Sequence, residues 1–151
     1  MLRLRAAIES DLPVIFELIG ELADYERLRE QLIGKAEDLR RHLFGEPRYA
    51  HALMAEWDGQ VAGFALYFFN YSTFMCRPGL YLEDLFVRPA YRGRGVGLNL
   101  LQALEQCARD SGCGRFEWSV LDWNQSAIDF YRRFGAAPRE GWTLYRKILS
   151  S

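Results

Sequence analysis

Cysteine and histidine are scarce in this chain of 151 residues. The three cysteines, Cys76, Cys107 and Cys113, are an odd number without the spacing of metal ligands. Free thiols of this kind are typical of a reducing compartment, so we predict a cytoplasmic protein. The two histidines, His42 and His51, are isolated and cannot build a histidine-rich site. We therefore predict that no metal is bound.

Long apolar runs and an excess of charge of one sign are also absent. No stretch approaches the roughly 18 apolar residues of a membrane span, and none after Met1 is long enough for a signal peptide. The 19 basic and 20 acidic residues give a formal net charge of -1. This balance predicts neither a nucleic-acid surface nor a polybasic membrane surface.

The composition is that of a folded protein. Half of the residues are hydrophobic and 15% are aromatic, so the chain can bury a core. We see no repeat, linker or low-complexity tract, and we predict one domain over residues 1–151.

The hydrophobic periodicity predicts a mixed α/β fold with a largely antiparallel front half. Asp58 and Gly59 lie between two strand-like runs, which is typical of a hairpin. The expected strands are 2–6, 49–57, 61–71, 81–87, 115–121 and 142–149, and the expected helices run from Ser10 to about Tyr25, over 36–44, from the glycines after Arg92, and from Asn124. We expect a loop over 72–79, at or beside the mouth of the site.

The central stretch runs from Leu80 to Leu98. Its strand carries two adjacent carboxylates, Glu83 and Asp84, of which a regular strand would turn at least one into a covered interior or a cleft. A turn rich in glycine and arginine then leads into a helix. Free backbone N–H groups at such a helix start form a site for phosphate or pyrophosphate.

The common nucleotide-binding loops fit this turn poorly. A Rossmann site would need a third glycine where the chain has Leu98, and a phosphate-binding loop would need a lysine nearby. The pattern Arg92-x-x-Gly95-x-Gly97 instead resembles the acetyl-coenzyme A (acetyl-CoA) pyrophosphate loop of the GCN5-related N-acetyltransferase (GNAT) superfamily. The later segment 124–136, an asparagine that opens a helix with Tyr131 and ends at a glycine, resembles that superfamily's second motif.

Within the superfamily the chain resembles the spermidine/spermine (diamine) acetyltransferases along nearly its whole length. The segments that carry this resemblance are 22–26, 61–69, 80–87, 122–124, 130–131 and 140–142. The resemblance implies the GNAT fold, with a mixed sheet of about six to seven strands flanked by about four helices. It also implies a homodimer that exchanges C-terminal strands.

The resemblance further implies acetyl-CoA as the co-substrate. Backbone groups of the central strand would hold the pantetheine arm and the oxyanion near a bulge at Leu85, Phe86 and Val87, and the glycine loop would hold the pyrophosphate. Asn124 and Ser126 would hold pantetheine or cap their helix. The full expected set is Leu85, Phe86, Val87, Arg92, Gly93, Arg94, Gly95, Val96, Gly97, Leu98, Asn124, Ser126 and Ala127.

The same resemblance assigns the chemistry. Tyr131 matches the general acid that protonates the leaving thiolate. Glu83 matches the carboxylate that accepts the amine's proton, directly or through water, although from the sequence alone Asp84 is an equal claimant. Tyr25 and Glu26 match residues that line the amine site, and Glu83, Asp84 and Asp122 add negative charge for a polycation.

Three functions remain open at this stage. The first is an acetyltransferase for diamines or polyamines such as spermidine or spermine. The second is the same chemistry on another amine, such as thialysine, a lysine-like amino acid or a protein N-terminus. The third is an acyl-CoA-binding module without catalysis.

Overall fold

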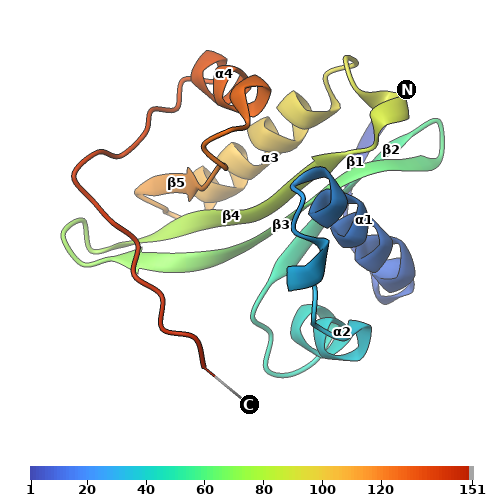
Figure 1. The fold of residues 1–151 in the computed structure, drawn as a ribbon, viewed down its shortest axis with the longest axis horizontal. Coiled ribbons are helices and arrows are strands. Elements are labelled where there is room, and N and C mark those ends of the chain that lie inside the picture. Colours follow the sequence, from blue (N-terminus) through green and yellow to red (C-terminus); the bar gives the residue numbers. More distant parts are fainter. Residues whose placement is uncertain (150–151) are drawn as a thin grey trace. The chain divides into compact units, whose positions relative to one another are not determined.

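The computed structural model describes residues 1–149, which hold five strands and four α-helices (Figure 1). These residues fall into two compact units, Met1–Ser119 and a second unit that begins at Val120. Within 1–149 no helix is long and apolar enough to cross a bilayer.

The first unit contains the whole sheet. Its strands are β1 (Leu2–Ala6), β2 (His51–Trp57), β3 (Gln60–Ser72), β4 (Arg77–Val87) and β5 (Arg115–Trp118). Its α-helices are α1 (Leu12–Tyr25), α2 (Ala36–Phe44) and α3 (Val96–Asp110), with short 3-10 turns at Glu9–Asp11, Arg29–Gln31 and Pro89–Tyr91. The second unit contains α4 (Gln125–Arg133).

The strands lie in the order β1-β2-β3-β4-β5. The first four are antiparallel to their neighbours and β5 is parallel to β4, which confirms the predicted antiparallel front half. Asp58 and Gly59 join β2 to β3 with φ angles of 49° and 81°. Two left-handed residues in succession are typical of a type I′ hairpin turn, as the sequence predicted.

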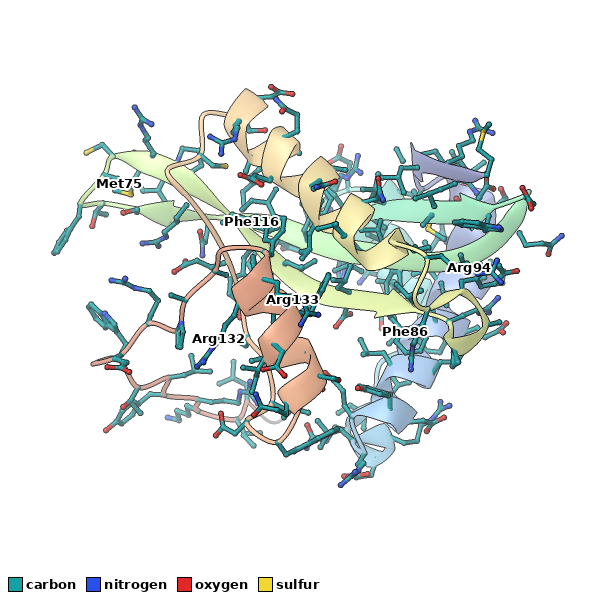
Figure 2. All side chains as sticks on the ribbon, turned by 90° about the horizontal axis from the view of Figure 1, so that it is seen from above. Met75, Phe86, Arg94, Phe116, Arg132 and Arg133 are labelled. Carbon is teal, nitrogen blue, oxygen red and sulfur yellow. The ribbon has the colours of Figure 1, made fainter. Side chains whose placement is uncertain are left out.

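Helices cover both faces of the sheet. α1 and α2 lie on one face and α3 lies on the other (Figures 1 and 2). Because side chains alternate along a strand, one set of sheet residues packs against Ile15, Leu18 and Leu43 of the first two helices. The set consists of Ala52, Met54, Phe64, Leu66 and Phe86. Phe86 therefore fixes which face of β4 lies toward α1.

Three predictions about strands were wrong. Residues 142–149 form no strand and have no sheet partner within the described residues, so their apolar side chains, Trp142, Leu144, Tyr145, Ile148 and Leu149, are 80–91% exposed. β5 ends at Trp118, so it is shorter than expected, and the sheet has five strands rather than six or seven. Half of the expected loop over 72–79 is strand, because β3 runs to Ser72 and β4 begins at Arg77, and only the residues between them, which include Met75, form a turn.

The turn with Met75 lies at the opposite end of the sheet from Arg94 of the glycine loop (Figure 2). The turn and the glycine loop therefore belong to different ends of the first unit.

β3 and β4 approach each other closely at Gly63. A Cβ at this position would lie 2.4 Å from the Phe86 carbonyl oxygen and 3.1 Å from the Val87 Cα, and both are backbone atoms of β4. We expect Gly63→Ala to lower the free energy of unfolding by about 1–3 kcal/mol because the strands must separate. Urea denaturation measures this, with Gly34→Ala as the control, since nothing lies within 4 Å of a Cβ there. Equal stability of the two variants would contradict the expectation.

Candidate active site

Two adjacent carboxylates lie at a β-bulge in β4. Asp84 pairs with Leu66 and Leu82 pairs with Tyr67, so Glu83 is the extra residue between them. In a regular strand neighbouring side chains would point to opposite faces, and a bulge relaxes that alternation. Asp84 lies two residues before Phe86, so it shares the face that looks toward α1.

The bulge was expected around Leu85 to Val87, and this expectation was wrong. Those residues pair in regular register with Ala65, Phe64 and Gly63 of β3. The irregularity instead lies at the charged pair, where regular pleating would have forced the two carboxylates onto opposite faces.

A third carboxylate comes from the end of α1. The Leu28 N–H donates to the Ala23 carbonyl (2.8 Å) and the Arg27 N–H donates to the Asp24 carbonyl (3.1 Å). These two bonds form a Schellman cap, with Arg27 in the left-handed conformation (φ 62°) where glycine is usual. The cap ends the helix at Tyr25 and sets the direction of the following Glu26.

Glu26, Glu83 and Asp84 lie close enough to repel one another. The pKa of Asp84 is raised from its ordinary value of 3.8 to about 7. Burial is the largest cause, and the negative charges of Glu83 and Glu26 add to it. The pKa of Glu26 is also raised, mainly by burial and further by the charge of Glu83. No ion pair to any of the three carboxylates is formed within residues 1–149. The cluster is an uncompensated negative site.

A groove on α1 shows the opposite arrangement. It has a volume of about 630 Å³ and is lined by Phe16, Glu17, Gly20, Glu21, Arg29 and Arg88. Its charges are paired: Arg88 lies 2.7 Å from Glu17 and 3.2 Å from Glu21, and Arg29 lies 2.8 Å from Asp24. Each of these groove charges therefore has a partner of opposite sign, whereas no carboxylate of the cluster has one among the described residues.

The raised pKa of Asp84 predicts how stability depends on pH. Between pH 4 and 7 the folded protein holds a proton on Asp84 that the unfolded chain has lost, so stability falls as the pH rises through this window. We expect Asp84→Asn to remove this decline. The change that the substitution causes in the free energy of unfolding should therefore be more stabilising at pH 8 than at pH 4, by about 1–3 kcal/mol. Urea denaturation at both pH values measures the difference. A variant whose effect is the same at both would show that Asp84 titrates at its ordinary pKa.

The glycine loop has the geometry of an anion site. Gly93 and Gly95 have φ angles of 78° and 79°, which residues with a Cβ rarely adopt. α3 begins directly after them at Val96. The first N–H groups of α3 have no acceptor within the helix, since its first backbone bond goes from Asn99 to Gly95. The loop backbone therefore fits a pyrophosphate group.

The two loop arginines lie against aromatic rings. The Arg94 guanidinium carbon is 5.1 Å from the centre of the Trp57 ring and 5.7 Å from that of Tyr91. The Arg92 carbon is 5.2 Å from the Tyr25 ring centre and 5.4 Å from that of Phe86. The sequence predicted both arginines only as charge for a phosphate and missed these contacts.

In the second unit, Asn124 caps α4. Its side-chain oxygen accepts hydrogen bonds from the Ala127 N–H and the Ser126 hydroxyl, both at 3.4 Å. Of the two roles expected for Asn124, capping is therefore observed. Tyr131 lies in the last turns of the same helix, with its ring centre 5.6 Å from that of Phe130.

Comparison with protein families settles the class. The model of the Acetyltransferase (GNAT) family matches residues 15–136, which include the bulge, the glycine loop and α4. The chain belongs to the GNAT acetyltransferase family. The predicted family and fold are confirmed, with fewer strands than expected.

Curated relatives of this acetyltransferase are named after different amines. Thialysine N-epsilon-acetyltransferase of Bos taurus is 41% identical over 95% of this chain and 90% of its own length. Spermidine/spermine N(1)-acetyltransferase-like protein 1 of Homo sapiens is 36% identical over 95% of this chain and 22% of its own length. L-ornithine N5-acetyltransferase of Arabidopsis thaliana is 31% identical over 95% of this chain and 83% of its own length.

Solved structures share the fold. An integron cassette protein from the mobile metagenome of V. cholerae has a TM-score of 0.80 and 26% identity, covering 97% of this chain and 92% of its own. An aminoglycoside acetyltransferase from a soil metagenomic sample, solved with sisomicin, also has a TM-score of 0.80 but 19% identity, covering 99% and 97% of the two chains. The second likeness shows the fold alone.

The chain is thus an acetyl-CoA-dependent amine N-acetyltransferase, as predicted. The relatives do not select its amine.

Proposed function

We propose that this enzyme acetylates a small aliphatic amine that carries at least one further ammonium group, such as a diamine or a polyamine. The observation that carries the proposal is the cluster of Glu26, Glu83 and Asp84 without a cation among the described residues. Three carboxylates in mutual repulsion destabilise the free protein, and a polycation relieves that repulsion. A neutral or singly charged amine relieves less of it.

The acceptor amine must lose a proton before it attacks. An alkylammonium has a pKa near ~10.4, so a base is needed at neutral pH. The resemblance to the diamine acetyltransferases favoured Glu83 as this base, whereas from the sequence alone Asp84 was an equal claimant. The pKa of Asp84, about 7, supports Asp84 as the proton acceptor, with Glu83 and Glu26 binding the ammonium groups. At the bulge the side chains of Glu83 and Asp84 need not point to opposite faces of the sheet, which permits this division of roles.

We propose that the acetyl donor lies along β4 and the glycine loop. β4 pairs with β5 only from Gly79 to Leu82, so beyond that point one edge of β4 has no strand partner within the described residues. Backbone groups at Leu85, Phe86 and Val87 would bind the pantetheine arm as an added strand does and would donate to the oxyanion. The N–H groups from Arg92 to Leu98 would hold the pyrophosphate, and Tyr131 would protonate the departing thiolate.

A second acceptor class is a lysine-like amino acid. The observation that favours it is the 39–41% identity to thialysine N-epsilon-acetyltransferases. Such a substrate brings a carboxylate of its own, which the acidic cluster would repel unless a cation meets it. A lysine-like amino acid therefore differs from a diamine in carrying a carboxylate.

Release of free thiol from acetyl-CoA tests the proposal. The panel contains spermidine, spermine, putrescine, thialysine, lysine, ornithine, a short peptide, and 1-aminobutane as the singly charged match for putrescine. We expect kcat/KM for putrescine to exceed that for 1-aminobutane by at least about tenfold. Turnover of thialysine but not of diamines would show that the acceptor is a lysine-like amino acid. Equal kcat/KM values for putrescine and 1-aminobutane would show that the acidic cluster does not select the amine.

We also propose that the enzyme is a homodimer. The exposed apolar side chains of 142–149 support this proposal, because a segment of this kind gains stability by burial against another chain. Sedimentation equilibrium of the full chain tests it, and a monomer at all concentrations would contradict it.

A further inference from the structure

Arg92 joins three parts of the first unit through one side chain. Its Nε–H donates to the Val87 carbonyl at the end of β4 (2.9 Å), and its guanidinium lies against both the Phe86 and the Tyr25 rings. Its backbone belongs to the glycine loop. The loop, the catalytic strand and the end of α1 therefore all meet at Arg92.

The Tyr25 ring that Arg92 contacts lies at the protein surface. Tyr25 is the last residue of α1 and is 39% exposed, and the chain turns directly after it through the left-handed Arg27. Phe86, on the other side of Arg92, is only 5% exposed and belongs to the core. Arg92 thus connects a ring at the surface to a ring that is fixed.

We propose that Arg92 is a positioning residue that sets the amine site from the acetyl-CoA loop. It would hold Tyr25, and with it the adjacent Glu26, in register with the carboxylates of β4. The inference rests on the proposed function, in which Glu26 binds an ammonium group. It differs from the role expected from sequence, because the guanidinium is engaged with two rings and a carbonyl on the protein.

A consequence is that the acetyl-CoA loop and the amine site are coupled. Any shift of the loop at Arg92 also shifts the contact with Tyr25, so an acetyl-CoA that orders the loop also orders the amine site. Coupling of this kind is reciprocal, and the bound amine should tighten the binding of CoA by the same factor.

The test compares Arg92→Leu with Arg94→Leu. Each variant removes one positive charge from the same loop and one arginine from a pair of aromatic rings, but Arg94 lies on Trp57 and Tyr91 rather than on Tyr25. Both variants should raise the KM for acetyl-CoA. At saturating acetyl-CoA, only Arg92→Leu should raise the amine KM, by about fivefold to thirtyfold, with kcat changed by less than about threefold.

Tyr25 supplies the second arm. Tyr25→Leu should reproduce the effect of Arg92→Leu, because it removes the ring against which the guanidinium lies. The double variant Arg92→Leu/Tyr25→Leu should be no worse than either single variant, because both remove the same contact. Additive effects, or the same amine KM in Arg92→Leu and Arg94→Leu, would overturn the inference.

Failure of the proposed function has a different signature. If no multiply charged amine is preferred over its singly charged match, the proposed acceptor is wrong. The comparison of Arg92→Leu with Arg94→Leu can still be made with whichever amine is turned over. Calorimetric titration of CoA into each variant, with and without that amine, measures the coupling independently of turnover. Equal coupling in wild type and Arg92→Leu would reject the positioning role.

Discussion

Replacing Asp84 with asparagine is expected to lower kcat/KM at pH 7 by about 100-fold or more. General bases contribute about 10²- to 10⁴-fold, and they act best when their pKa lies near the working pH. Burial together with the charges of Glu83 and Glu26 places the pKa of Asp84 at about 7. Asparagine has nearly the same shape but cannot accept the amine's proton.

The pH profile identifies the base. In the wild type, kcat/KM should rise with pH and show an inflection near 7 as Asp84 loses its proton, and Asp84→Asn should lack that inflection. The profile of kcat should have its inflection at lower pH, since a bound ammonium group favours the ionised carboxylate. The amine's own titration near ~10.4 contributes equally to both proteins, so it cancels in the comparison.

Glu83→Gln is the matched control. It removes one of the charges that raise the pKa of Asp84, so it should move the inflection to lower pH and weaken amine binding while a base remains. If Glu83→Gln abolishes the inflection and Asp84→Asn retains it, the base is Glu83, as the family resemblance implied. The two variants therefore distinguish the two carboxylates.

Activity and stability should change in opposite directions at Asp84. The carboxylate destabilises the folded protein above pH 7, so asparagine should make the protein more stable at pH 8 while making it less active. A residue that serves only the fold would lose both together. Opposite changes in activity and stability would show that the carboxylate cluster serves function at the cost of stability.

Most of the fold could be predicted from the sequence because its signals are local. The helix over 36–44 was predicted at its observed bounds, and the Asp58-Gly59 hairpin follows from the conformation that these two residues favour. The predicted family also followed from short motifs. The strand expected over 142–149 was wrong, because a strand exists only where another strand offers its backbone groups, and no local pattern reports that.

The site was predicted less completely than the fold. The sequence shows that Glu83 and Asp84 are adjacent, but the bulge depends on the register of β3 against β4, with Leu66 and Tyr67 on either side of the shift. The repulsion from Glu26 and the contact of Arg92 with Tyr25 join residues far apart in the chain. Contacts of this kind arise only when α1 packs on the sheet.

Tyr131→Phe is expected to lower kcat by about 10- to 1000-fold with little change in the KM for acetyl-CoA. Phenylalanine keeps the ring and its contact with Phe130 but removes the hydroxyl that would give a proton to the departing thiolate. Steady-state kinetics measure the effect, and Tyr71→Phe is the control because Tyr71 is 60% exposed and its hydroxyl has no assigned role. An unchanged rate in Tyr131→Phe would remove this tyrosine from the mechanism.

The leaving group separates a general acid from a residue that merely shapes the site. A thiol of low pKa departs without a proton, so an acetyl thioester of such a thiol should need no help from Tyr131. We expect the ratio of wild-type to Tyr131→Phe rates to fall toward 1 with that donor and to remain large with acetyl-CoA. If the ratio is the same for both donors, the hydroxyl acts by binding or packing. Because Asp84→Asn removes the base and leaves the departing thiolate untouched, its defect should persist with both donors, so the two variants report the two proton transfers separately.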